Sequence, residues 1–407
     1  MSVPKLRFKE FDGDWSPYVL KDFVSFRKGK GISKADISEN GINECIRYGE
    51  LYTTYGQVID HIHSKTNVSK SECILSKAGD VIIPASGETQ IDIATASCVL
   101  YDDIILSGDL NILSHEENGS WLAYYLSSAK KLEIAQLAQG NSVVHLYSSQ
   151  LKDLKINKPS KEEQTRIASF LSNVDEKISQ LTQKHELLSQ YKQGMMQKLF
   201  SQQLRFKADD GSEFGEWEEK LIKDIADVKG GKRIPKGYPL VNENTGHPYI
   251  TVSDMNRSYS IDSTNIRYVP LEVVDTIKRY TITDKDIFIS VAGTLGIIGK
   301  IPTEFNGANL TENADKLTNL KCHQDFLIYL LDSGYLSELI ESTATTSAQP
   351  KLALYAIEQL EVQIPCPEEQ TKIANFLSAI DQKIEVVAQQ IEQAKQWKKG
   401  LLQQMFV

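Results

Sequence analysis

The stretch that decides the fold of this chain occurs twice: residues 162–178 read EEQTRIASFLSNVDEKI, and residues 368–384 read EEQTKIANFLSAIDQKI. The two copies align without a gap at an offset of 206 residues, and 12 of their 17 positions are identical. The match weakens afterwards but stays in register to Phe200 and Phe406. Recurrence at one fixed offset indicates a duplicated architecture, in which each copy follows a separate block of sequence.

Both copies have the periodicity of long helices. Apolar residues recur at alternating steps of four and three positions over about five heptads, which is the coiled-coil pattern. Each copy begins with proline followed by acidic residues, and carboxylates at a helix start complement the helix dipole. His185, Lys192 and Lys398 interrupt the apolar seams, and the two lysines occupy equivalent positions. The seam residues are Ile167, Leu171, Val174, Ile178, Leu181, Leu188, Met195 and Leu199 in the first copy, and Ile373, Leu377, Ile380, Ile384, Val387, Ile391, Ala394, Leu401 and Met405 in the second.

Because each seam needs a partner, we expect the two helices to pair antiparallel, with two separate surface helices as the alternative. The expected fold is α+β with a pseudo-twofold repeat: two globular α/β domains separated by two long antiparallel coiled-coil helices. The expected boundaries are a first globular domain at 1–158, a first helix at 159–203, a second globular domain at 204–364 and a second helix at 365–407.

The two globular blocks agree at their edges and diverge inside. Trp15 and Gly29-Lys30 recur as Trp217 and Gly231-Lys232. A common frame carrying two different binding surfaces would explain this pattern, and drift after duplication is the alternative. Alternation and Gly turns predict strands at 46–51, 80–83, 97–106, 249–253, 286–289 and 297–301, and helices at 121–138 and 325–342.

Composition narrows the class of protein. The net charge is −9 and the pI is about 5.4, so any surface that binds nucleic acid must be a local patch. Only the region 151–206 is basic, with 10 Lys and Arg against 6 Asp and Glu. The five cysteines are scattered without a CxxC pair, as in reduced intracellular proteins. Without a signal-peptide core or a long apolar run, we expect a cytoplasmic protein with no membrane association.

Motifs of catalysis are missing from the sequence. We find no Asn/Asp-Pro-Pro-Tyr/Phe motif for methyl transfer, no GxGxxG fingerprint, and no defensible Ser/His/Asp set or acid pair. The glycines at 293, 296 and 299 have the wrong spacing for a phosphate loop, so a glycine-rich turn is the better interpretation. His61 and His63 lack a third ligand, so we expect no metal site. Because the catalytic motifs are missing, we also expect no catalytic residues.

Polar, basic and aromatic residues in turns are the candidates for contact with base edges and phosphates. Each one alone is also an ordinary loop residue. The candidates are Lys30, Arg47, Tyr48, Ser86, Glu88 and Thr89 in the first block, and Lys232, Arg233, Lys236, Ser253, Asp254, Arg257 and Thr294 in the second.

With these motifs the chain resembles the specificity subunits of type I restriction–modification systems. The resemblance rests on the twin EEQT[RK]IA helices, on the preceding LKINKP at 154–159 and LEVQIP at 360–365, and on the alternation of variable block and helix. It covers essentially the whole chain. The segments at 140–146 and 346–352 look like the family's loop before each helix, and they add His145 and Lys351 to the candidate DNA contacts.

The resemblance implies a non-catalytic subunit of a DNA adenine methyltransferase and endonuclease complex. Each globular target-recognition domain would read one half of a bipartite double-stranded DNA target. The helices would space these domains and dock two modification subunits, which bind S-adenosylmethionine, and restriction subunits using ATP and Mg²⁺ join the full complex. No cofactor is expected on this chain itself. Candidate docking residues on the outer face of the first helix are Arg166, Lys177, Gln180 and Lys184.

Two other classes of protein remain open at this point. A coiled-coil adaptor would bind proteins through its globular domains, without dependence on DNA sequence. An enzyme, such as a fused methyltransferase or nuclease, is disfavoured by the missing motifs.

Overall fold

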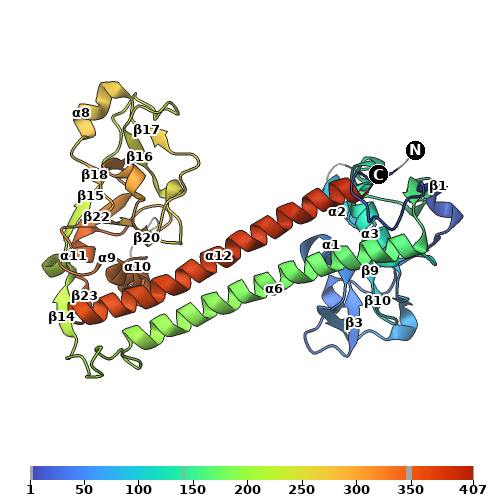
Figure 1. Ribbon diagram of the computed structural model, residues 1–407, viewed down its shortest axis with the longest axis horizontal. Helices are drawn as coiled ribbons and strands as arrows, with labels where there is room; N and C mark the ends of the chain where they lie inside the picture. The colour runs from blue at the N-terminus through green and yellow to red at the C-terminus, as the bar shows by residue number, and fades with distance from the viewer. Residues whose placement is uncertain (1–2, 141–142, 345–350, 407) are drawn as a thin grey trace. The chain divides into compact units, whose positions relative to one another are not determined.

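The computed structural model describes residues 3–140, 143–344 and 351–406. The chain forms two compact units: unit 1 comprises Met1–Thr182 and Gln389–Val407, and unit 2 comprises Gln183–Ala388 (Figure 1). Each unit contains one globular block together with part of each long helix, α6 (Lys161–Phe200) and α12 (Pro367–Met405). The family-like loops at 140–146 and 346–352 lie partly outside the described residues.

The globular part of unit 1 has two main sheets and two strand pairs. The five-stranded sheet has the order β2 (Ser25–Lys28), β11 (Leu110–Ser114), β7 (Val81–Pro84), β9 (Ser97–Val99) and β4 (Val58–Ile59). The four-stranded sheet has the order β5 (Ser64–Thr66), β3 (Asn43–Ile46), β10 (Ile105–Leu106) and β6 (Ile74–Leu75). The pairs are β1 (Ser16–Val19) with β13 (Lys155–Lys158), and β8 (Ser86–Gly87) with β12 (Val144–His145). The helices are α1 (Glu50–Thr53), α2 (Gln90–Ile93), α3 (Gly119–Ser128), α4 (Lys131–Leu137) and α5 (Ser148–Leu151).

Unit 2 repeats this plan with four strands in each of its two main sheets. One sheet has the order β15 (Asp227–Gly230), β22 (Ala314–Thr318), β19 (Ile287–Ser290) and β20 (Ile298–Gly299). The other has the order β17 (Arg267–Tyr268), β16 (Pro248–Ile250), β21 (Ala308–Leu310) and β18 (Thr281–Ile282), and β14 (Glu218–Leu221) pairs with β23 (Glu361–Ile364). The helices are α7 (Ile222–Ile225), α8 (Val274–Ile277), α9 (Gln324–Leu330), a π-helical turn (Leu331–Tyr335), α10 (Leu336–Ala344) and α11 (Leu354–Glu358).

The two globular blocks share one strand topology. In unit 1, β3 pairs parallel with β10, which pairs antiparallel with β6. In unit 2, β16 pairs parallel with β21, which pairs antiparallel with β18. The order β2-β11-β7-β9 likewise matches β15-β22-β19-β20. A common frame beneath divergent sequences is therefore confirmed at the level of strand pairing.

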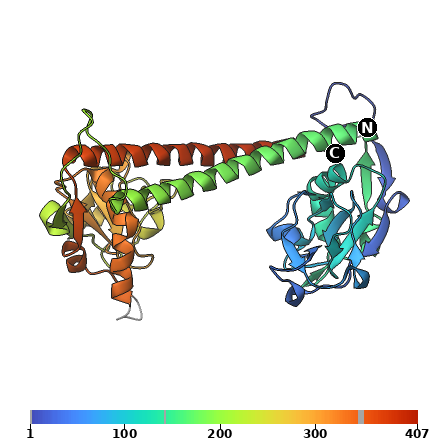
Figure 2. The same ribbon diagram turned by 90° about the horizontal axis from the view of Figure 1, so that it is seen from below.

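In unit 1, the start of α6 and the end of α12 run antiparallel beneath one core. Leu171 of α6 and Met405 of α12 belong to the same buried cluster as Trp121 and Tyr125 of α3. Figure 2 shows α3 between α6 and the strands of this unit, so that α3 connects the long helices to the sheets. The ring of Phe170 also meets Trp397 edge-on at 5.9 Å.

In unit 2, the end of α6 and the start of α12 pack in the same antiparallel sense. Leu199 of α6 and Leu377 of α12 are fully buried in one cluster with Phe326 of α9. The expected pairing of the seams is thus confirmed within each unit. One seam position differs, because Met196 is 7% exposed and buried in this cluster while its neighbour Met195 is only half-buried. A straight helix drifts relative to a 3.5-residue repeat, which accounts for a shift of one residue near the helix end.

Several predicted elements end differently in the structure. The predicted strand at 46–51 is wrong beyond Ile46, because the amide of Arg47 donates to Glu50 Oε2 at 2.8 Å and closes a turn into α1. The strand at 249–253 likewise ends at Ile250, where a turn of 3₁₀ helix follows. The strand at 97–106 is two strands in different sheets, and the strand at 297–301 is confined to β20.

The two predicted block helices are also interrupted. The segment 121–138 forms α3 and α4 with a break between them, and 325–342 contains a π-helical turn with Gly334 at φ 152°. A positive φ of this kind is open to glycine and strained for other residues, so this kink follows from the local sequence. No helix in the described ranges is long and apolar enough to cross a bilayer.

Candidate nucleic-acid interface

In unit 1, three turns meet where β3 and β10 end. The amide of Lys30 donates to the carbonyl of Leu106 at 3.0 Å, and the amide of Tyr48 donates to Ser107 Oγ at 3.2 Å. A Cβ atom at Gly29 would overlap the Ser107 carbonyl oxygen, so only glycine permits this close approach. The structure therefore brings the candidates Lys30, Arg47 and Tyr48 together at the end of the sheet where β3 and β10 stop.

A second group of candidates adjoins this edge through the loop at 107–109. The amide of Ala85 donates to Asp109 O at 2.8 Å, which places β8 beside that loop. On the β8–β12 pair, Ser86 Oγ and His145 Nδ1 lie 3.2 Å apart. We call the segments 29–30, 47–49, 86–89, 107–109 and 144–146 loop surface 1.

The equivalent backbone contacts form loop surface 2 in unit 2. The amide of Lys232 donates to Leu310 O at 2.8 Å, and the amide of Val291 donates to Asn313 O at 2.8 Å. A Cβ atom at Gly231 would overlap the carbonyl of Thr311, as at Gly29 in unit 1. Loop surface 2 comprises the segments 231–236, 251–257, 292–296, 311–313 and 351–352.

Some candidate side chains make hydrogen bonds that hold the loops in shape. Arg47 donates to Glu50, which is 5% exposed. Asp254 accepts from the amide of Thr251 at 2.7 Å and closes the turn after β16. Thr89 caps α2 by accepting from the amide of Asp92 at 3.1 Å. These interactions fix loop shape, which is a different role from direct contact with a base.

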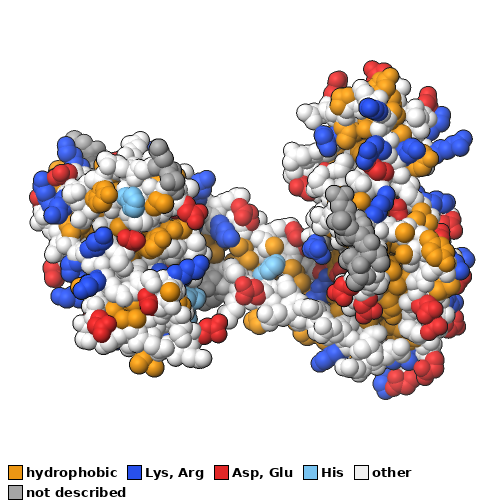
Figure 3. Space-filling view, turned by 180° about the vertical axis from the view of Figure 1, so that it is seen from behind, with side chains coloured by type: hydrophobic (Ala, Val, Ile, Leu, Met, Phe, Trp, Pro, Cys, Tyr) orange, Lys and Arg blue, Asp and Glu red, His pale blue; other side chains and the backbone are white. Residues whose placement is uncertain are grey.

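Other candidates are exposed, and within the described part of the chain none of the charged ones takes part in a salt bridge. They are Lys30, Glu88, Lys236, Ser253, Arg257, Thr294 and Lys351. Arg233 is exposed but pairs with Glu312, and Lys232 lies 5.6 Å from the ring centre of Tyr280. On the face drawn in Figure 3, Lys and Arg side chains are scattered among Asp and Glu side chains, which agrees with local patches of positive charge.

The candidate docking residues on α6 divide into two kinds. Arg166 stacks over the ring of Phe8 at 4.8 Å and approaches Glu10 at 3.4 Å, so it holds the N-terminal segment. Lys177 and Lys184 are exposed, and Gln180 donates to Glu176 on the same helix at 3.0 Å. The spacing of 177, 180 and 184 places these three side chains on one face of α6.

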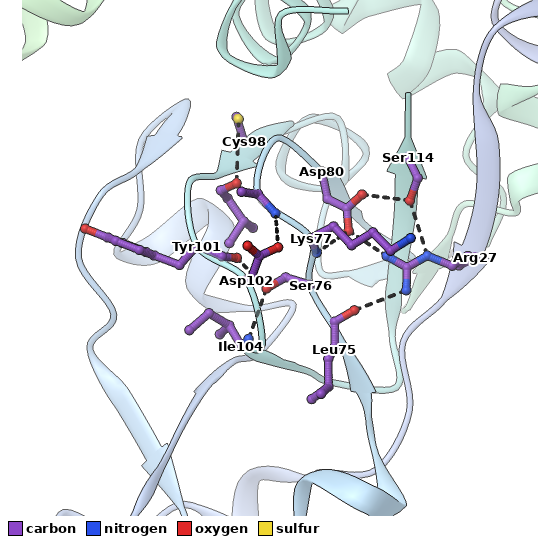
Figure 4. Close-up of polar contacts among 12 residues, drawn as sticks. Arg27, Leu75, Ser76, Lys77, Asp80, Cys98, Tyr101, Asp102, Ile104 and Ser114 are labelled. Carbon is purple, nitrogen blue, oxygen red and sulfur yellow. Dashed lines mark hydrogen bonds and ion pairs between the residues drawn. The ribbon is translucent and has the colours of Figure 1, made fainter. Parts of the chain in front are cut away.

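Figure 4 shows a polar network that the sequence analysis did not identify. Asp80, which directly precedes β7, is 3% exposed and accepts from Arg27 and from Ser114 Oγ. In unit 2 the equivalent Asp286 accepts from Lys316 at 2.8 Å. Burial alone would raise the pKa of Asp286, but the hydrogen bond from Lys316 leaves that pKa below its ordinary value. The sequence signal for this network was an Asp directly before the equivalent strands β7 and β19. Its basic partner could not be predicted, because Arg27 lies in β2 whereas Lys316 lies in β22.

The repeated EEQ motif joins each long helix to its globular block. Glu163 is 1% exposed and accepts two hydrogen bonds from Arg7 at 2.7 Å and one from Trp15 Nε1 at 3.3 Å. In unit 2, Glu369 accepts equivalent bonds from Arg205 and Trp217. The sequence analysis recorded the two tryptophans as recurring landmarks without finding the glutamate that each of them contacts.

Comparison with known proteins agrees with this duplicated arrangement. The family model of the type I restriction modification DNA specificity domain matches residues 12–190 and again 215–396. The MjaVIII type I restriction enzyme specificity subunit of Methanocaldococcus jannaschii is 25% identical over 414 residues, which is 97% of this chain and 94% of the relative. The putative MjaX specificity subunit of the same organism is 29% identical over 428 residues, covering 98% of this chain and 94% of the relative.

The fold also matches a solved structure along its whole length. The type I restriction–modification system S subunit from M. genitalium covers 100% of this chain and 99% of its own, with a TM-score of 0.66 and 19% identity. The chain belongs to the type I restriction–modification DNA specificity family, on the strength of the two family matches. It is a specificity subunit, and its part in the system is recognition of the DNA target rather than catalysis.

Proposed function

We propose that loop surface 1 reads one part of a bipartite double-stranded DNA target and that loop surface 2 reads the other part. The observation that carries this proposal is the equal backbone frame of the two surfaces, which display different side chains. Lys30 on the first surface corresponds to Lys232 on the second, whereas Arg47 and Tyr48 correspond in place to Thr251 and Val252. Equal frames with unequal side chains suit two half-sites of different sequence.

The chemistry of both surfaces fits groove contacts. Exposed Lys and Arg side chains pair with phosphates, while Ser, Thr and Glu side chains can contact base edges. Glu88 suits the amino group of cytosine, since a carboxylate accepts from that donor. Residues such as Glu50 and Asp254 act indirectly, because they hold the turns that present these groups.

The chain then works as one part of a larger complex in the cytoplasm, where its DNA target lies. Two modification subunits would supply S-adenosylmethionine and perform the methylation, and restriction subunits would supply ATP-dependent cleavage with Mg²⁺. The segments 1–158 and 204–364 would act as target-recognition domains, and 159–203 and 365–407 as the helices that space them. Lys177, Gln180 and Lys184 offer an exposed helix face for the modification subunits.

The net charge of −9 is compatible with this role. Phosphate neutralisation supplies much of the affinity of proteins for DNA, so an acidic chain alone is expected to bind weakly. A partner subunit that contacts the flanking phosphates would supply the missing affinity, while this chain supplies the choice of sequence.

An exchange of blocks tests the proposal. Residues 1–158 are replaced by the corresponding block of a relative with another specificity, and methylated positions are mapped at base resolution in cells that express the complete complex. We expect one part of the methylated motif to change while the other stays the same. The matched exchange of 204–364 should change the second part alone. A change in both parts, or in neither, would contradict two-surface reading and favour an adaptor that does not read DNA.

A further inference from the structure

The lysine that interrupts each helix seam makes an ion pair across the helix pair. In unit 1, Lys398 Nζ of α12 lies 2.5 Å from Asp175 Oδ1 of α6. The same carboxylate accepts from the hydroxyl of Tyr124 on α3 at 2.6 Å. Burial and the charge of Asp175 raise the pKa of Tyr124, so its hydroxyl remains a donor. Three helices therefore meet at one carboxylate.

Lys398 has a further contact outside these helices. Its ammonium group donates to Gln57 Oε1 at 2.9 Å, and its side chain is only 17% exposed. An ammonium group has three donors, so it can hold a loop and a carboxylate at the same time. Gln57 follows α1, which itself follows the Arg47-Tyr48 turn of loop surface 1.

Unit 2 repeats this arrangement with a different loop residue. Lys192 Nζ of α6 lies 2.6 Å from Asp381 Oδ1 of α12, and Tyr329 of α9 donates to Asp381 Oδ2 at 2.6 Å. The loop partner of Lys192 is Tyr259, whose hydroxyl oxygen accepts at 3.0 Å. That hydroxyl also donates to Asp332 Oδ2 at 2.6 Å.

Gln57 and Tyr259 occupy the same place in the shared frame. The amide of Cys98 donates to the carbonyl of Gln57 at 2.9 Å, and the amide of Lys300 donates to the carbonyl of Tyr259 at 3.0 Å. Ser97 of β9 pairs with Ile82 of β7, and Gly299 of β20 pairs with the equivalent residue of β19, Phe288. The two donors, Cys98 and Lys300, are the residues that directly follow Ser97 and Gly299. The lysine, the aspartate and the helix tyrosine recur, while the loop group changes from an amide to a phenol.

The loop in unit 2 needs such a contact to hold its shape. Tyr259 has a φ of 60°, a left-handed conformation that a bulky side chain rarely adopts. It lies two residues beyond the 251–257 segment of loop surface 2, which contains the exposed candidates Ser253 and Arg257. Residues 256–258, 260 and 261 also line a cleft of about 1000 Å³ together with Lys192 and Asp381. The segment that follows β16 and the two long helices therefore line the same cleft within unit 2.

We infer that Lys398 and Lys192 are positioning residues for target reading, each of which fixes the recognition segment of its own unit against the helix pair. The inference rests on the proposed function, because it takes loop surfaces 1 and 2 as the reading surfaces. Lys398 acts on the segment 47–57 and Lys192 acts on the segment 251–259. Each lysine thus controls the fidelity of one part of the target and leaves the other part unaffected.

The test uses the complete methyltransferase complex with DNA duplexes that carry one wrong base in either part of the target. For Lys398→Met we expect discrimination against wrong bases in the first part to fall roughly tenfold, as for the loss of a hydrogen bond to a charged group. Discrimination in the second part should stay unchanged. Lys192→Met should give the opposite result. Lys395→Met and Lys198→Met, at exposed positions of the same helices, are the matched controls.

Two milder variants separate positioning from stability. Gln57→Leu and Tyr259→Phe remove the loop side of each contact and leave the ion pair between the helices in place. Tyr259→Phe also removes the hydrogen bond to Asp332. We expect them to reproduce the one-sided loss of discrimination with little change in thermal unfolding, and they decide the matter if the lysine variants fail to fold. An equal loss for both parts, or no loss with Gln57→Leu and Tyr259→Phe, would overturn the inference. If the block exchange described above changes one part of the motif while these variants change nothing, the inference alone fails and the proposed function stands.

Discussion

At the scale of single residues, the contacts of Glu163 and Glu369 explain why the second acid of the repeated EEQ motif is the same in both copies. Each is buried and accepts from one arginine and one tryptophan of the globular block that precedes its helix. Removal of a buried carboxylate would leave the guanidinium group without its partner, which costs more than the loss of one exposed ion pair. The first acid of each motif is exposed, although it is equally well repeated in the sequence.

A second feature at this scale is a difference between equivalent positions of the two units, since unit 2 has an aspartate at position 315 where unit 1 has Asn111. Asn111 is buried and donates to Leu146 O at 2.9 Å. Asp315 lies at the equivalent position of β22, and burial raises its pKa from 3.8 to about 6, although Lys351 opposes the shift. The folded protein therefore keeps a proton that the unfolded chain loses. This stabilising contribution is complete below pH 3.8 and is lost as the pH rises through about 6.

We expect Asp315→Asn to raise the free energy of unfolding at pH 7.5 by about 1–3 kcal/mol, since each unit of pKa shift corresponds to about 1.4 kcal/mol. The variant should also lose stability less than the unchanged protein between pH 5 and pH 7.5. Urea unfolding at both pH values measures this effect. Asn111→Asp is the reciprocal control and should introduce a similar pH dependence in unit 1. Parallel pH profiles for Asp315→Asn and the unchanged protein would contradict the assignment.

At the scale of elements, the close contact at Gly29 sets the path from β2 into loop surface 1. We expect Gly29→Ala to destabilise unit 1 by about 1–3 kcal/mol, because a new methyl group must displace the backbone at Ser107. Discrimination should fall for the first part of the target only. Thermal unfolding and methylation of duplexes with single wrong bases measure the two effects.

Gly108→Ala is the matched control for this prediction. Gly108 lies in the same loop, but an added Cβ atom would meet no atom within 4 Å. Its effect on stability should stay within about 0.5 kcal/mol, as for ordinary surface substitutions. The same destabilisation for both alanine variants would show that the loop, and not the close approach, is the sensitive feature.

The elements also show what the sequence could predict. Periodicity identified α6 and α12 and their antiparallel pairing, because the apolar seam of each helix, which includes Leu171 in α6 and Leu377 in α12, must be buried wherever the helices lie. The short strands were less predictable, since a side-chain hydrogen bond such as that of Glu50 to the amide of Arg47 ends a strand that the apolar pattern would continue. Contacts such as that of Lys398 with Gln57 depend on residues 341 positions apart, which no local pattern contains.

At the scale of the whole assembly, the exposed face of α6 is the proposed docking site for a modification subunit. We expect the double charge reversal Lys177→Glu and Lys184→Glu to weaken co-purification with that subunit by about tenfold or more, since like charges placed against a complementary surface are costly. Pull-down from cells that express both subunits measures the effect. Lys399→Glu, at an exposed position of α12, is the control. Unchanged co-purification of the double variant would rule out this face.

The matched anchoring of the two blocks also bears on how new specificities arise. The second block presents Arg205 and Trp217 to Glu369 in the way that the first block presents Arg7 and Trp15 to Glu163. A gene that carries the second block in both places would therefore encode a chain whose attachment points remain satisfied. Both parts of its preferred target would then have the same half-site sequence. Exchange of a whole block would therefore change the recognised sequence while the contacts that attach the block to its helix are kept.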